Sequence, residues 1–119
     1  MESILTSIKK LLGIDAEYTQ FDVDIIIHIN TVLMALTQMG VGPEEGFAIA
    51  DEYATWEEFI GDKPYLNSVK SYMYLRVRSL FDPPLSSAAL DSMNKLAAEF
   101  EWRLQVAVEN NKSTEKEEP

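Results

Sequence analysis

Residues 22–39 read DVDIIIHINTVLMALTQM and form the most apolar stretch of the chain. The triple isoleucine at 25–27 favours a strand, but the segment is too long for one, since strands average about 5–6 residues. Asp22 suits an N-cap, Asp24 adds negative charge to the first turn, and Gly40 supplies a stop. Apolar residues lie on nearly every side of this helix, which is typical of a helix at the centre of a fold.

Other segments repeat apolar residues at the helical spacing, and we predict helices over 3–12, 65–81 and 87–108. Lys9 and Lys10 lie in the last turn of the first helix, where cations complement the helix dipole, and Gly13 ends it. Pro83 and Pro84 end the third helix, because a proline disfavours helical backbone at the residue before it.

Residues 40–64 form a long connection that contains four glycines and two prolines. Connections of this length are uncommon in a compact domain, but the aromatic and aliphatic residues here indicate an ordered loop. Thr55 is a good N-cap for a short helical turn over 56–60. Residues 47–49 are either a short strand or a buried anchor for the loop.

These patterns predict an all-α fold. Residues 1–109 form one domain, a bundle of about four helices with a long irregular loop between the second and third. Residues 110–119 lack apolar side chains, so we expect a flexible, disordered polar tail.

The composition excludes several classes of function. The chain of 119 residues has no cysteine, so disulfides and thiolate chemistry are absent. Its start lacks the features of a secretory signal. The formal net charge of −10 opposes binding to nucleic-acid phosphates and to anionic membranes. An acidic surface can still line a passage through which DNA slides without sticking.

Charge is divided unevenly between two adjacent segments. Residues 44–62 contain seven acids and no base, whereas residues 63–81 contain four bases and no acid. The two segments either face each other across a subunit interface, where their charges are complementary, or are solvated surfaces on which like charges cluster by chance. On a helical wheel Arg76 points away from Lys70 and Arg78, so the three cations cannot all serve one contact.

A search for catalytic chemistry is mostly negative. His28 is the single histidine, and in the most apolar helix it is best explained as a core or interface residue with a hydrogen-bond partner. The paired carboxylates of the loop are best explained as solvated surface, because no pocket is evident around them. Glu99 and Arg103 form an ordinary i, i+4 pair. We therefore predict no catalytic residue, no metal site and no cofactor.

Aromatic residues on more than one side of the expected helices indicate surfaces that a monomer rarely exposes. The charged and aromatic candidates for partner or interface contacts are Glu44, Glu45, Asp51, Glu52, Trp56, Glu57, Glu58, Lys70, Arg76, Arg78 and Trp102.

Several blocks, in order, resemble the siphophage head–tail connector (adaptor) family over residues 3–108. They are SIKKLLG at 7–13, IIHIN at 26–30, QMGVGP at 38–43, WEEF at 56–59, VKSYMYLRVR at 69–78, FDPP at 81–84 and EFEWRL at 99–104. Each block alone is weakly specific, whereas their order and spacing together are specific.

The resemblance implies a structural protein without catalysis. It implies a ring of twelve copies in the virion, contacting the portal protein on one side and a stopper or tail-completion protein on the other. DNA would pass through the lumen without specific binding, and no membrane would be involved. The location implied is the virion neck, after assembly in the host bacterial cytoplasm.

Two other readings compete with the connector. A small acidic helical regulatory or interaction protein fits the charge and the helicity, but neither the order of the blocks nor the basic helix. An enzyme lacks convergent polar groups, and a buried pocket around His28 would restore that reading.

Overall fold

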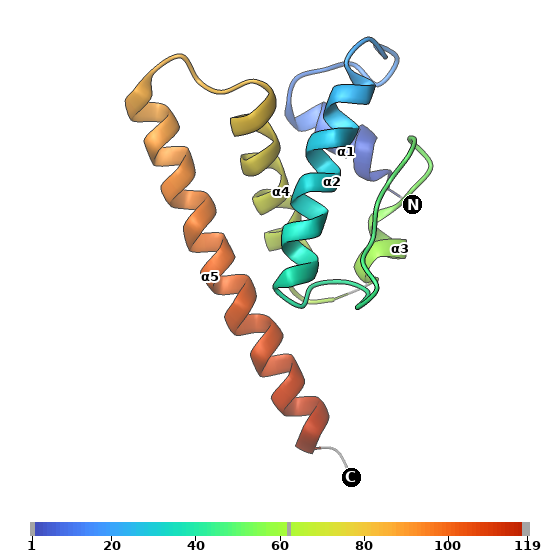
Figure 1. Ribbon diagram of the computed structural model, residues 1–119, viewed down its shortest axis with the longest axis vertical. Helices are drawn as coiled ribbons and strands as arrows, with labels where there is room; N and C mark the ends of the chain where they lie inside the picture. Colours follow the sequence, from blue (N-terminus) through green and yellow to red (C-terminus); the bar gives the residue numbers. More distant parts are fainter. Residues whose placement is uncertain (1, 62, 118–119) are drawn as a thin grey trace.

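The computed structural model describes residues 2–61 and 63–117, with side chains as far as residue 111. Its helices are α1 (Ile4–Leu11), α2 (Asp22–Gln38), α3 (Trp56–Ile60), α4 (Leu66–Phe81) and α5 (Ser87–Glu117). The fold is all-α, as predicted, and α3 is the short turn expected after Thr55 (Figure 1).

Helices α1 and α3 begin at polar side chains that accept otherwise unpaired backbone N–H groups. Ser3 Oγ accepts from the Thr6 amide at the start of α1. Thr55 and Glu58 form a complete capping box on α3. The prediction of an N-cap at Asp22 is wrong, because Phe21 holds that position and Asp22 is the first helical residue. The Asp22 carboxylate forms an ion pair with Lys9 instead.

The helices share one hydrophobic core. In Figure 1, α2 lies in front of α1, and α4 stands between α2 and the long α5. The side chains of Ile25, Ile29 and Leu33 from α2 meet Val69 and Met73 from α4 in this core, and all five are fully buried. The α4 helix is thus the central one, since α1, α2 and α5 all pack against it.

The long loop after α2 is fastened at two places. Its end pairs with the N-terminus, where Ile4 N donates to Ala54 O at 3.0 Å and Trp56 N donates to Glu2 O at 3.2 Å. Its middle is held by Asn30 of α2, whose amide donates to Ile49 O (3.0 Å) and accepts from Ile49 N (2.8 Å). Residues 47–49 are therefore the loop anchor of the two alternatives, with Ile49 buried.

We expect Asn30→Ala to destabilise the protein by about 2 kcal/mol, because both backbone groups of the buried Ile49 lose their partners. Amide hydrogen exchange at Ile49 should accelerate accordingly. Thr31→Ala is the matched control, since the exposed Thr31 hydroxyl bonds only to a carbonyl of its own helix. Equal exchange at Ile49 in both variants would show that Asn30 does not anchor the loop.

The last helix is longer than its apolar stripe predicts. The stripe ends at Val108, but α5 continues to Glu117 through eight of the residues assigned to the tail. No proline or glycine interrupts residues 87–118, so the backbone ladder continues without an apolar face to bury. In Figure 1 this end of α5 projects beyond the other helices. Glu118 and Pro119 of the predicted tail lie outside the described residues.

Lys9 is the main surprise of the fold, because sequence reasoning assigned it only an interaction with the helix dipole. Its side chain is 2% exposed. The ammonium donates to Ala16 O at 3.0 Å and to Tyr18 O at 2.8 Å. It also forms an ion pair with Asp22 Oδ1 at 2.8 Å. One buried cation therefore joins α1, the loop after it and the start of α2.

Candidate interaction surfaces

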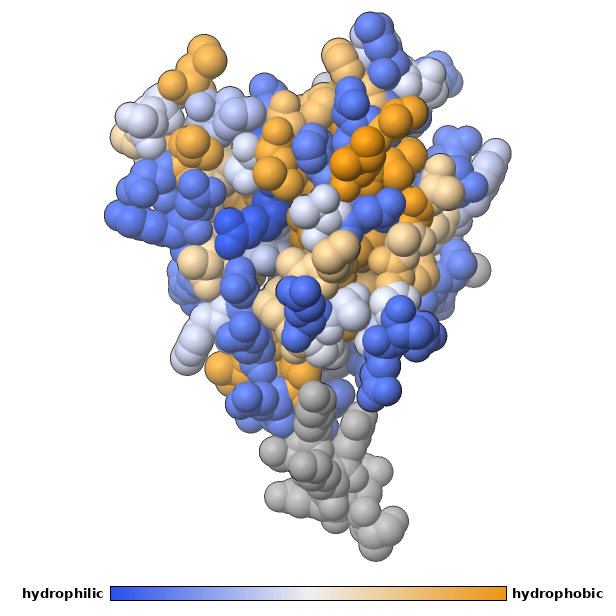
Figure 2. Space-filling view, viewed as in Figure 1, coloured by the Kyte–Doolittle hydropathy of each residue, from blue (hydrophilic) through white to orange (hydrophobic). Residues whose placement is uncertain are grey.

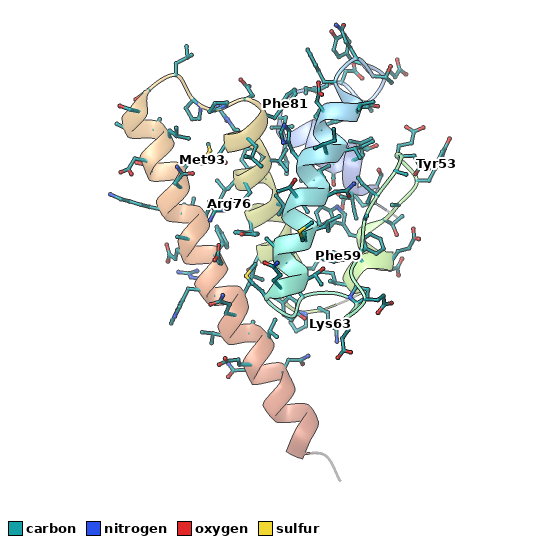
Figure 3. All side chains as sticks on the ribbon, in the orientation of Figure 1. Tyr53, Phe59, Lys63, Arg76, Phe81 and Met93 are labelled. Atoms are coloured by element: carbon teal, nitrogen blue, oxygen red, sulfur yellow. The ribbon has the colours of Figure 1, made fainter. Side chains whose placement is uncertain are left out.

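The described acidic residues of the long loop and α3 are exposed to solvent. Those predicted from the sequence are exposed at each described position, namely Glu44, Glu45, Asp51, Glu52, Glu57 and Glu58. Asp62, the last acid of the segment, lies outside the described residues. Tyr53 lies among them, is also exposed, and points away from the bundle (Figure 3). Because the backbone of this loop is anchored at Ile49, Ala54 and Trp56, the acids lie on a defined surface.

These acids are not held in ion pairs with other described residues of the subunit. None of the ion pairs formed among the described residues includes a loop acid. Two loop acids have local structural roles instead, since Asp51 accepts from the Tyr53 amide and Glu58 completes the cap on α3. Carboxylates that form no ion pair among the described residues are available to a partner or to bulk solvent.

Trp56 is a core residue and not an exposed contact. Only 2% of it is exposed, and its indole N–H donates to Ser7 Oγ at 2.7 Å. The prediction of Trp56 as an interface residue therefore receives no support from its burial. Sequence alone did not distinguish it from Trp102, which is 63% exposed on α5.

The three cations of α4 separate as the helical wheel predicts. Arg76 points toward α5, where it meets Glu101 at 3.2 Å (Figure 3). Tyr72 donates to the same carboxylate, and burial raises the pKa of its hydroxyl, which stays protonated at neutral pH. Arg76 therefore holds two helices together within one subunit.

Lys70 lies instead in a groove bounded by α1, α4 and α5, and Arg78 bonds to Tyr74 in the lining of that groove. Lys70 forms an ion pair with Glu2 at 2.8 Å and lies over the Trp56 ring. Arg78 donates to the Tyr74 hydroxyl at 2.9 Å. The groove has a volume of about 680 Å³, and its lining includes Lys10, Leu11, Lys70, Tyr74, Leu96 and Phe100. Apolar walls with cations at the rim suit an apolar, acidic partner surface.

The sequence missed an apolar stripe on the outer side of α2. Val23, Ile27 and Met34 are 71%, 57% and 62% exposed. Because apolar residues lie on nearly every side of α2, the sequence predicted a helix at the centre of the fold. That prediction is wrong, since the rest of the protein covers α2 on one side only. Figure 2 shows apolar atoms at the surface in the region of α2. Exposed apolar patches are common at protein–protein contact surfaces.

His28 is half-buried near the end of α4. Its ring approaches the edge of Phe81, with ring centroids 6.3 Å apart. Within the described residues, no cluster of histidines and carboxylates has the arrangement of a metal site. Glu99 and Arg103 are paired at 2.6 Å on the surface of α5, as their spacing predicts.

A profile of the phage connector protein family matches residues 4–111. The match covers α1 to α4 and most of α5, and therefore both the α2 stripe and the groove.

The chain belongs to the phage connector protein family.

No curated protein and no solved structure gives a significant match to this connector. Membership confirms the resemblance found in the sequence blocks and implies a structural role at the virion neck. In the part of the connector that the structure describes, no helix is long and apolar enough to cross a bilayer.

Proposed function

We propose that this connector forms a ring at the head–tail interface, docks on the portal protein and surrounds the passage for DNA. The observation that carries the proposal is the family match over residues 4–111. A stopper or tail-completion protein binds the opposite side of the ring. The exposed apolar stripe of α2 supports this assembly. Monomeric proteins rarely expose apolar patches, whereas a ring subunit buries such a surface against its neighbour.

The first test is the copy number of the chain in purified particles of its phage, measured by quantitative mass spectrometry. A copy number close to that of the portal, with twelve as the proposed value, supports a ring at the neck. Absence of the chain from mature particles would contradict the proposal. A small acidic interaction protein would then become the better explanation.

We also propose that the acidic loop faces the lumen, where negative charge keeps DNA from adhering to the wall. Neutralising Glu44, Glu45, Glu52 and Glu57 should slow DNA packaging and ejection. These four are exposed, and no hydrogen bond that they accept holds the loop, so the fold should be unaffected. Like-charge repulsion is screened by salt, so the defect should shrink as ionic strength rises.

The control changes charge elsewhere, at the exposed Glu17 and Glu109. Ejection can be followed by the release of DNA from particles triggered in vitro. If the loop variant and the control eject DNA at the same rate as the wild type, the acids do not line the passage. The ring proposal itself would survive that result.

A further inference from the structure

Two complementary surfaces lie on different parts of this connector. One is the α2 stripe, Val23, Ile27 and Met34, which recurs along one side of the helix and is turned away from the core. The other is the groove whose lining comes from α1, α3, α4 and α5 and the segments beside them, with no contribution from α2. A ridge of aliphatic side chains and a groove with Leu11, Leu96 and Phe100 in its walls have matching chemistry.

The charges around the two surfaces are also complementary. Residues 11–62, which include α2, contain no lysine or arginine. Asp24 is exposed beside Val23. The groove contains Lys10 and Lys70 together with Glu2, which is paired with Lys70, so its lining keeps a net positive charge at Lys10. Opposite potentials on two surfaces steer their encounter and fix their register, whereas two copies of the acidic α2 side repel each other.

The shape of the subunit provides the area that such a contact requires. The molecule measures 51 × 35 × 20 Å along its principal axes, so it is a thin plate with two broad sides. A stable interface buries about 800 Å² on each partner, which a broad side of this plate accommodates.

We infer that the α2 stripe of one copy docks into the α1–α4–α5 groove of a second copy. The inference rests on the ring proposed above and specifies which surfaces meet in it. Because the two surfaces differ, the contact is heterologous, and each docked copy leaves one free stripe and one free groove for the next. Repetition of such a contact closes into a ring when the rotation between neighbours allows it.

Cysteine crosslinking tests this contact directly, because the chain has no cysteine of its own. Ile27→Cys marks the stripe and Leu96→Cys marks the groove, and both positions are exposed. Particles carrying the double variant are treated with a short bismaleimide and separated by denaturing electrophoresis. We expect a ladder of crosslinked connectors, whereas particles with either single variant should yield monomers.

Crosslinked dimers from Ile27→Cys alone would overturn the inference, because they require two stripes to meet. Failure of the double variant to crosslink, in particles that contain several copies of the connector, would overturn it as well and leave the ring proposal intact. Absence of the connector from particles would count against the ring proposal itself. The copy number therefore separates the two failures.

A second pair of variants does not depend on crosslinking geometry. Ile27→Asp places a charge on the stripe, and Tyr53→Asp places the same charge on another exposed apolar side chain. We expect Ile27→Asp to reduce incorporation into particles at least tenfold while the purified monomer keeps its thermal stability. Tyr53→Asp should incorporate normally. Equal incorporation of both variants would overturn the inference.

Discussion

Replacing Lys9 by methionine should destabilise the connector by about 3 kcal/mol. Methionine keeps most of the aliphatic stem but removes the ammonium, and the carbonyls of Ala16 and Tyr18 then lose their donor. The Asp22 carboxylate loses its ion-pair partner as well. For a domain of this size the melting temperature should fall by roughly 10 °C, which differential scanning calorimetry measures.

Lys10→Met is the matched control, because the neighbouring Lys10 is exposed and has the same chemistry. It should change stability by less than about 0.5 kcal/mol. Loss of the Lys9 contacts should also free the loop before α2, so cleavage after Tyr18 by chymotrypsin should accelerate in the Lys9 variant alone. If both variants have the melting temperature of the wild type, the buried ammonium does not stabilise the contact between α1 and the start of α2.

Replacing Gly42 by alanine should cost about 3 kcal/mol, for two reasons that add. Gly42 has a positive φ of +86°, which L-residues with a side chain adopt only with strain. A Cβ at this position would also overlap the ring of Phe59, which is buried against the core and cannot move away freely. Urea denaturation measures the loss as a lower midpoint.

Gly46→Ala separates the two contributions. Gly46 has a similar φ of +94°, but a Cβ there meets nothing within 4 Å. The control should therefore lose only the backbone part, about 1 kcal/mol. An equal loss of stability in the two variants would mean that the Phe59 ring moves to make room for the added Cβ. The loop after α2 would then be packed less tightly than the distance between Gly42 and Phe59 indicates.

Local patterns predicted the helices well because their signals lie within each segment. The ends of α1, α2 and α4 fall within about one residue of prediction, since glycines and prolines terminate the backbone ladder wherever they occur. Thr55 and the turn after it were found for the same reason. The end of α5 was missed because the prediction followed the apolar stripe, and the last turns of the helix contain no apolar residue.

The interaction surfaces were harder to predict, because exposure depends on residues distant in the sequence. Trp56 and Trp102 are equally plausible contacts in the sequence, but Ser7 and the N-terminal segment cover only Trp56. The α2 stripe was hidden among apolar residues that face the core. A helical wheel gives the directions of side chains but does not say which of them another helix covers.

The sequence by itself determined the all-α fold, the helix positions, the excess of acid and the family, because periodicity, breakers, charge and block order are properties of the chain. Tertiary structure decided that Lys9 is buried, that Arg76 joins two helices, and that α2 keeps an apolar side in solvent. The physical reason is that burial is a relation between segments. Whether a side chain meets water or another helix is settled only when α1, α4 and α5 pack together.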